Sequence, residues 1–209
     1  MDLYTYYRST SSYRVRIALA LKGLDARQLP VNLLQGEQRQ DAYRALNPQG
    51  RVPALVTDAG ELLVQSPAII EYLEETHPEP ALLPAEPLQR AKQRGVAALI
   101  GCDIHPLHNV AVLNRLRGLG VDEPGVEQWI SHWIGEGLAA VEALIGDAGF
   151  CFGAQPGLAD VYLLPQLYAA RRFKVDLDGF SRILRVERLA LEHPAFRQAH
   201  PDAQADKPA

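Results

Sequence analysis

Residues 83–87, which read Leu-Pro-Ala-Glu-Pro, divide the chain into two parts with different patterns. Short strand and helix patterns alternate before this segment, and only helical periodicity follows it. Two prolines within four residues interrupt regular structure, as is typical of a linker. The chain has 209 residues, enough for two small, closely packed domains. We therefore predict an α/β domain over residues 1–82 and an all-helical domain over residues 88–209.

The first part has the pattern of a small mixed sheet with helices. We predict strands at 3–7, 26–33, 54–57 and 61–64, and helices at 15–22, 41–46 and 65–75. In the second part, helices are expected at 88–109, 123–145, 158–173 and 181–192. Pro106 should bend or end the first of these. The tail from residue 201 onward is rich in Pro, Asp, Gln and Ala, and we expect it to be frayed.

Charge and cysteine content exclude several function classes. The net charge is −4, from 21 basic and 25 acidic residues, which argues against binding to nucleic acid or to an anionic membrane. No apolar run approaches the roughly 20 residues that span a bilayer, and no secretory signal pattern opens the chain. The two cysteines form no disulfide or zinc pattern, so we expect a cytoplasmic protein.

The first candidate site is the segment 8–12, Arg-Ser-Thr-Ser-Ser, at a predicted strand-to-helix junction. A helix start offers unpaired N–H groups and the positive end of the helix dipole, and both stabilise an anion. A serine hydroxyl there can donate to a thiolate and lower the pKa of the parent thiol below its ordinary value of about 8.5. Simple helix capping explains the same residues, and on spacing alone both interpretations stay open.

Two further segments could present backbone groups to a ligand. Val52-Pro53 precedes a predicted strand, a setting in which a cis peptide bond is sometimes used. Gln65-Ser66 opens the next helix and could hold a carboxylate by its N–H groups, although an ordinary cap is the simpler explanation. His105 and His108 are three residues apart, but Pro106 lies between them and no third ligand has a recognisable spacing, so we expect no metal site.

Taken together, these segments resemble one family. Residues 6–23 (YYRSTSSYRVRIALALKG) are similar to the opening of the zeta-class glutathione transferases, the maleylacetoacetate isomerases. Residues 47–55, 65–75, 103–109 and 171–177 match the same family, and the resemblance runs from residue 3 to about 200. It implies a thioredoxin-like N-terminal domain, an all-α C-terminal domain, the glutathione transferase fold and a homodimer.

The resemblance also implies roles for individual residues. Ser9, with Thr10 beside it, would contact the sulfur of glutathione, the cofactor. The other contacts to glutathione would come from the Val52 backbone beside Pro53, from Gln65 and Ser66, and from His105, His108 and Asn109. The candidate catalytic residues are Arg8, Ser9, Thr10 and Ser11. Ser11 occupies a position where the family usually has cysteine, so a thiol is not required there.

The implied reaction is a glutathione-dependent cis–trans isomerisation of maleylacetoacetate to fumarylacetoacetate, in tyrosine or phenylalanine breakdown. Arg8 and Arg172 are the candidates for binding the small dicarboxylate substrate, because guanidinium holds carboxylate in a bidentate fork. Arg171 could take the place of Arg172. Val110-Ala111 stands where maleylpyruvate isomerases tend to carry arginines, which favours maleylacetoacetate. A maleylpyruvate isomerase, a general zeta-class transferase and a non-catalytic glutathione-binding module remain alternatives.

A second departure from the family concerns the helix predicted at 158–173. Members of the family usually begin the capping box of this helix with Ser or Thr, whereas this chain has Gly157. Glycine can occupy an N-cap but supplies no side-chain acceptor, so we expect a small loss of stability, from a few tenths to about 1 kcal/mol.

Overall fold

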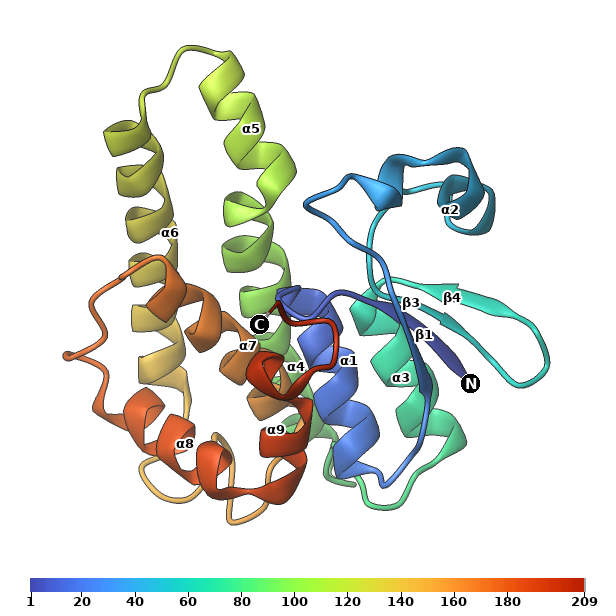
Figure 1. Cartoon of the computed structure of the whole chain (residues 1–209). Coiled ribbons are helices and arrows are strands. Elements are labelled where there is room, and N and C mark those ends of the chain that lie inside the picture. Colours follow the sequence, from blue (N-terminus) through green and yellow to red (C-terminus); the bar gives the residue numbers. More distant parts are fainter. Residues whose placement is uncertain (209) are drawn as a thin grey trace. The chain divides into compact units, whose positions relative to one another are not determined.

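The computed structural model describes residues 1–208, which divide into two compact units (Figure 1). The first unit contains Met1–Ala81 and the described residues from His193 onward, and the second contains Leu82–Glu192. This division separates the two units near residue 82 and groups the segment after Glu192 with the first unit, whereas the prediction from the sequence assigns residues 88–209 to the helical domain.

In the described part of the first unit, four strands form one mixed sheet in the order β2-β1-β3-β4. The strands are β1 (Asp2–Thr5), β2 (Arg27–Pro30), β3 (Ala54–Val56) and β4 (Leu62–Val64). β1 pairs parallel with β2 and antiparallel with β3, and β3 pairs antiparallel with β4. The expected mixed sheet and its strand sequence are confirmed, although each strand is shorter than predicted.

Helices of the first unit are α1 (Thr10–Leu21), α2 (Asp41–Leu46) and α3 (Ser66–Thr76), with a short 3-10 turn at Glu37–Arg39. α1 and α3 pack against each other. The buried Lys22, at the end of α1, forms an ion pair with Glu74 at 2.7 Å and donates to the carbonyl of His77. This contact joins the ends of the two helices whose beginnings carry the candidate site residues.

A C-terminal helix, α9 (Pro194–Ala199), also packs on α1, and a 3-10 turn at Pro201–Ala203 follows it. Phe196 is 1% exposed, and Pro201 and Gln204 are buried. The expectation of a frayed tail from residue 201 onward is therefore wrong for Pro201 and Gln204. Composition alone predicted fraying, because it does not show that Gln204 donates to the carbonyls of Gln198 and His200 or that Asp206 accepts from the N–H of Tyr7.

The regular structure of the second unit is helical, apart from an isolated β-bridge between Phe150 and Gly153. It contains α4 (Pro87–Ala98), a π-helical turn (Leu99–Ile104), a 3-10 turn (His105–His108), α5 (Val110–Gly118), α6 (Glu123–Leu144), α7 (Leu158–Arg172) and α8 (Ser181–Glu192). The helix predicted at 88–109 is thus three consecutive segments, and α5 is an element that the sequence patterns did not predict. α7 is buried along almost its whole length and forms the core of this unit.

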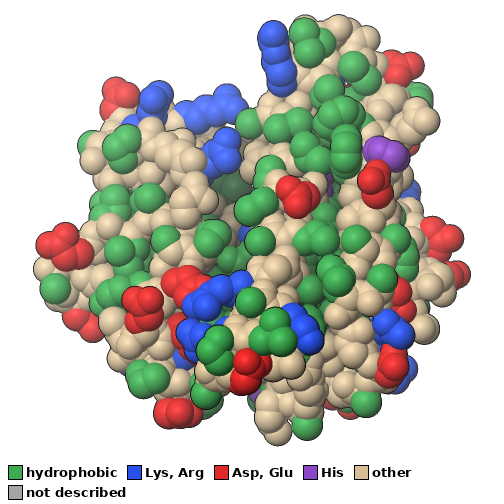
Figure 2. All heavy atoms as spheres, turned by 180° about the vertical axis from the view of Figure 1, so that it is seen from behind, with side chains coloured by type: hydrophobic (Ala, Val, Ile, Leu, Met, Phe, Trp, Pro, Cys, Tyr) green, Lys and Arg blue, Asp and Glu red, His purple; other side chains and the backbone are tan. Residues whose placement is uncertain are grey.

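The run Pro87–Gly118 is long and apolar enough to cross a membrane by length and composition alone, with 33% of its most apolar stretch buried. The sequence-based expectation that no run approaches this length therefore does not hold by that measure. The run is segmented, however: the helix type changes from α to π, then to 3-10 and back to α, and Asn109, before the last segment, has an extended backbone and caps α5 with its side chain. Acidic and basic side chains are interspersed on the face of the molecule drawn in Figure 2.

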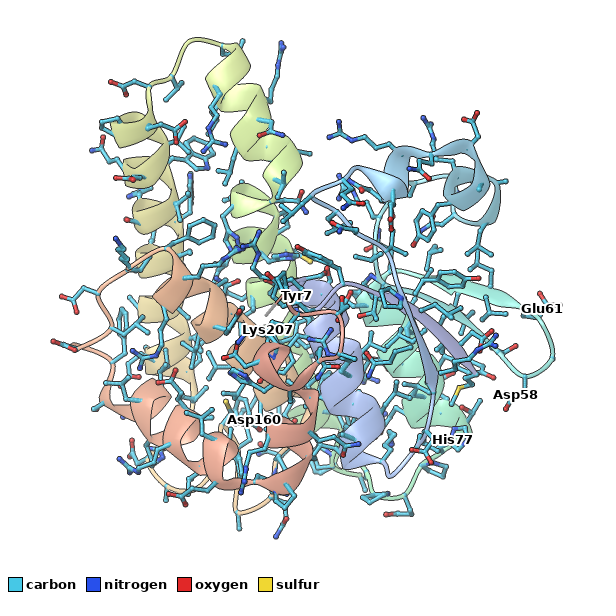
Figure 3. The ribbon with its side chains drawn as sticks, viewed as in Figure 1. Tyr7, Asp58, Glu61, His77, Asp160 and Lys207 are labelled. Carbon is cyan, nitrogen blue, oxygen red and sulfur yellow. The ribbon has the colours of Figure 1, made fainter. Side chains whose placement is uncertain are left out.

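Gly157 at the start of α7 has a neighbour that the sequence does not reveal. A Cβ at this position would lie 2.5 Å from the side-chain oxygen of Gln93 on α4. Asp160, which is labelled in Figure 3, accepts hydrogen bonds from the N–H groups of Gly157 and Cys151, each at 2.9 Å. A glycine at this N-cap therefore leaves space for the Gln93 side chain. A Ser or Thr here would supply a side-chain acceptor, but its Cβ would collide with Gln93.

Candidate functional site

The first group of candidate residues lies at the N-terminus of α1. Ser9 is the N-cap, and its Oγ accepts a hydrogen bond from the Ser12 N–H at 3.2 Å. The capping interpretation of this segment is thus correct, and it leaves the hydroxyl hydrogen of Ser9 to donate elsewhere. In the described residues, the N–H groups of Thr10 and Ser11 in the first turn have no acceptor, as at the start of any helix. One hydroxyl and these N–H groups can together stabilise an anion.

Ser11 connects this helix to the Val52-Pro53 turn. Its hydroxyl donates to the Val52 carbonyl at 3.4 Å, and the Val52–Pro53 peptide bond is cis. Val52 is 8% exposed, and within residues 1–208 its N–H has no hydrogen-bond partner. A buried N–H without a partner is costly, so this group is suited to a ligand that brings an acceptor.

The turn before Pro53 is held by side chains that sequence reasoning did not select. The Tyr43 hydroxyl and the Asn47 amide donate to the Arg51 carbonyl at 2.7 and 2.8 Å. Burial raises the pKa of Tyr43 to about 12, so its phenol keeps the proton that it donates. Asn47 is 1% exposed. The Asn-Pro-Gln-Gly turn was visible in the sequence, but the carbonyl that Asn47 would bind was not.

Gln65 and Ser66 lie at the N-terminus of α3, as predicted. Gln65 has a positive φ of 73°, an uncommon conformation for a side-chain-bearing residue that points to a functional constraint. Its amide donates to the side-chain oxygen of Gln49 at 2.8 Å, so Gln49 is a further polar group at this position that the sequence analysis did not select. Ser66 is 3% exposed, within the first turn of the helix.

Arg8 belongs to the same unit as Ser9. Its guanidinium carbon lies 5.9 Å from the centroid of the Tyr7 ring, a cation–π contact. The Tyr7 ring in turn packs edge-on against Tyr6 at 4.8 Å. Tyr6 and Tyr7 of this loop belong to a hydrophobic cluster of aromatic and aliphatic side chains, and the following residues form it: Tyr4, Tyr6, Tyr7, Val31, Leu33, Tyr43, Leu46 and Val52. This cluster anchors the residues that precede Ser9 and Pro53.

The second group of candidates lies in the helical unit. His108 is 4% exposed, and its Nε2 lies 3.1 Å from the side-chain oxygen of Gln166 on α7. The His105 ring packs edge-on against His108 at 5.3 Å, and the Phe173 ring does so at 5.6 Å. In residues 1–208, no group of three or more His, Cys, Asp or Glu side chains is arranged to hold a metal ion. The sequence analysis missed Gln166 and Phe173.

The two adjacent arginines at the end of α7 have different surroundings. Arg171 forms an ion pair with Glu187 on α8, and its Nε donates at 2.7 Å. Arg172 instead places its guanidinium carbon 4.5 Å from the centroid of the Phe173 ring. Because Phe173 contacts His108, Arg172 belongs to the histidine cluster and Arg171 does not. Of the two arginines, Arg172 is thus the one that lies with the other candidate residues of this unit, and the sequence had left the choice between them open.

The chain matches two family profiles, "Glutathione S-transferase, N-terminal domain" over residues 3–81 and "Glutathione S-transferase, C-terminal domain" over residues 123–203. It is 72% identical to a maleylacetoacetate isomerase of Pseudomonas aeruginosa, with 100% of both chains covered. It is 48% identical to a maleylpyruvate isomerase of a Ralstonia species, with 99% of both covered.

Solved structures agree with these sequence matches. A holo maleylpyruvate isomerase, described as a bacterial zeta-class glutathione transferase, superposes with a TM-score of 0.96 at 47% identity, with 100% of both chains covered. A maleylacetoacetate isomerase from Anaeromyxobacter dehalogenans with bound glutathione gives 0.90 at 45% identity, covering 99% of this chain and 97% of that one. Another structure of that protein holds dicarboxyethyl glutathione and citrate in the active site, with a TM-score of 0.90 at 44% identity, covering 100% and 97%.

Proposed function

Because the chain belongs to the zeta class of the glutathione transferase family, with the maleylacetoacetate isomerases, we propose that it converts maleylacetoacetate to fumarylacetoacetate with glutathione as cofactor. The observation that carries this proposal is Ser9 at the N-terminus of α1, with its hydroxyl hydrogen left to donate. The 72% identity to a maleylacetoacetate isomerase, against 48% to a maleylpyruvate isomerase, supports the choice of substrate.

The donor groups of the first unit suit glutathione. The partnerless Val52 N–H would bind the cysteinyl carbonyl, and the first turn of α3 with Gln65 and Ser66 would bind the γ-glutamyl carboxylate. The histidine cluster with Asn109 would bind the glycine end. When bound, glutathione supplies a thiolate that adds to the cis double bond, lets the resulting single bond rotate and then leaves unchanged.

Each of the remaining steps belongs to a residue of this chain. The Ser9 hydroxyl and the α1 N–H groups hold the sulfur as a thiolate at neutral pH. Arg8 and Arg172 bind the two carboxylates of the substrate and stabilise the negative charge that develops on its carbonyl oxygen. Thr10 and Ser11 support this arrangement, Ser11 through the Val52 carbonyl. We further propose a cytoplasmic homodimer that acts in tyrosine or phenylalanine breakdown and binds neither nucleic acid nor membrane.

A side-by-side assay tests this proposal. Glutathione-dependent loss of the ultraviolet absorbance of maleylacetoacetate and of maleylpyruvate is followed with the purified chain. We expect a higher kcat/KM for maleylacetoacetate. A higher kcat/KM for maleylpyruvate would reassign the substrate. Glutathione binding without turnover of either diacid would instead indicate a non-catalytic glutathione-binding module.

A further inference from the structure

The loop between β1 and α1 carries both Arg8 and Ser9, so its conformation sets where these two side chains lie. Its main chain is tied internally by one hydrogen bond, from the Ser9 N–H to the Tyr6 carbonyl at 3.0 Å. The other hydrogen bonds to the main chain of Tyr6 and Tyr7 come from Arg16 and Asp206, which lie outside the loop. A short irregular segment of this kind holds one conformation only if such partners are present.

Arg16 donates hydrogen bonds to two carbonyl groups of this loop. From α1, its Nη2 donates to the Tyr7 carbonyl at 2.9 Å, and its Nη1 approaches the Tyr6 carbonyl at 3.4 Å. Arg16 is 4% exposed, and its Nε donates to the Ala199 carbonyl at the end of α9, at 3.1 Å. One buried guanidinium therefore bonds both to the loop and to the C-terminal segment.

Asp206 supplies the partner for the N–H group of Tyr7. Its Oδ2 accepts a hydrogen bond from the Tyr7 N–H at 2.8 Å, across 199 residues of sequence. Figure 3 shows Tyr7 beside the C-terminal segment that continues to Lys207. The Tyr7 ring contacts the Arg8 guanidinium, and Ser9 follows Tyr7 by two residues. The hydrogen bond to Asp206 therefore holds the main chain next to Arg8 and Ser9.

The segment from His200 to Lys207, which we name the C-terminal strap, has its own internal support. Gln204 is 7% exposed, and its amide donates to the carbonyls of Gln198 and His200, each at 2.9 Å. Lys207 pairs with Asp202 at 2.7 Å, and the His200 ring packs edge-on against Tyr13 of α1. These contacts hold the strap in place on both sides of Asp206, so that its carboxylate lies next to the N–H of Tyr7.

We propose that Asp206 is a positioning residue of the thiolate site, which fixes the loop Tyr6–Ser9 through the Tyr7 N–H. The inference rests on the proposed function for the role of Ser9 and Arg8. The strap would thereby help to position Arg8 and Ser9.

The test compares Asp206→Ala, which removes the acceptor, with Asp206→Asn, which keeps an acceptor oxygen but removes the charge. Asp25→Ala, at an exposed carboxylate of the same unit, serves as the control. In the full-length protein, the thiolate absorbance of bound glutathione against pH, kcat and KM are measured, with amide hydrogen exchange at Tyr7. A denaturation midpoint shows that each variant is folded.

We expect Asp206→Ala to raise the pKa of the bound thiol, to speed exchange of the Tyr7 amide, and to lower kcat/KM about tenfold. Asp206→Asn and Asp25→Ala should remain within about threefold of the wild type. The sign of the pKa change is decisive, because loss of a nearby negative charge alone would lower the pKa of the thiol.

An unchanged or lowered thiol pKa in Asp206→Ala would overturn the positioning role, and so would Asp206→Asn as impaired as Asp206→Ala. The thiol measurement requires only glutathione binding. A wild-type chain that binds glutathione but isomerises neither diacid would contradict the proposed function, while the thiol pKa would still decide the role of Asp206.

Discussion

The two groups of candidate residues differ in what holds them. In the first unit, apart from the side chains of Arg8 and Gln65, the candidate binding groups are main-chain N–H groups and hydroxyls at helix N-termini and turns, around Ser9, Val52 and Ser66. In the helical unit, they are long side chains stacked on one another, from His105 to Arg172. Main-chain groups survive most substitutions, whereas a stacked side chain depends on each neighbour. The first group should therefore tolerate change except at the hydroxyl, and the second should be sensitive at several positions.

The largest effect is expected at Ser9. Ser9→Ala removes the hydroxyl donor and should raise the pKa of bound glutathione and lower kcat/KM by about 10²–10³-fold. The thiolate absorbance against pH measures the first effect. As a control, Asp122→Ala removes the N-cap acceptor of α6, which should lose similar stability, about 1 kcal/mol, and leave the thiol unchanged. An unshifted thiol pKa in Ser9→Ala would leave the helix N-terminus as the sole activator.

A smaller effect is expected at Arg172. Arg172→Ala should raise KM for the diacid about 10- to 100-fold, as expected for losing one or two charge-assisted hydrogen bonds, with glutathione affinity nearly intact. Arg171→Ala is the matched control, because its guanidinium is paired with Glu187 on α8. It leaves the buried Glu187 carboxylate without this partner, so it should lower the free energy of unfolding by about 1–3 kcal/mol and leave KM unchanged. Steady-state kinetics that reversed the two outcomes would assign Arg171 to the substrate instead.

A substitution at Gln166 tests whether the candidate residues of the helical unit depend on this buried partner of His108. Gln166→Leu leaves the Nε2 of His108 without its amide partner and should lower the free energy of unfolding by about 1–3 kcal/mol. KM for glutathione should rise with it. Chemical denaturation and titration with glutathione measure the two effects. The exposed Gln89 on α4 is the control, and Gln89→Leu should stay within about 0.5 kcal/mol of the wild type.

The smallest effect is a pH dependence of the C-terminal strap. Burial lowers the pKa of His200 below its ordinary value near 6.5, and the cations of Arg16 and Lys207 act in the same direction while Asp202 opposes them. The unfolded strap then binds more protons than the docked one, so docking is strongest above pH 6.5 and weakens as the pH falls through the folded pKa. Proteolysis of the tail should be faster at pH 5.5 than at pH 7.5, and His200→Gln should abolish that difference.

Much of the fold was predictable because its signals are local. The Ser-Thr-Ser-Ser run, the Gln-Ser-Pro segment and the Val-Pro pair mark starts of helices and turns within a few residues, and the structure has helices or turns at each. The interruption at 99–109 was predicted only as a bend at Pro106. Its π-helical and 3-10 segments depend on packing against α6, where Gly137 leaves a space into which Ile104 fits.

The sequence by itself determined most of the strands and helices, with α5 and the segments at 99–108 as exceptions, and it determined which helix starts can stabilise an anion, because these properties depend on neighbours within one or two turns. Only the tertiary structure decided that Arg171 turns to Glu187 while Arg172 lies on Phe173, that Gln166 meets His108, and that Asp206 reaches Tyr7. The last two contacts join residues 58 and 199 positions apart. Partners at such separations are chosen by how the packed elements bring side chains together, which no local pattern of residues records.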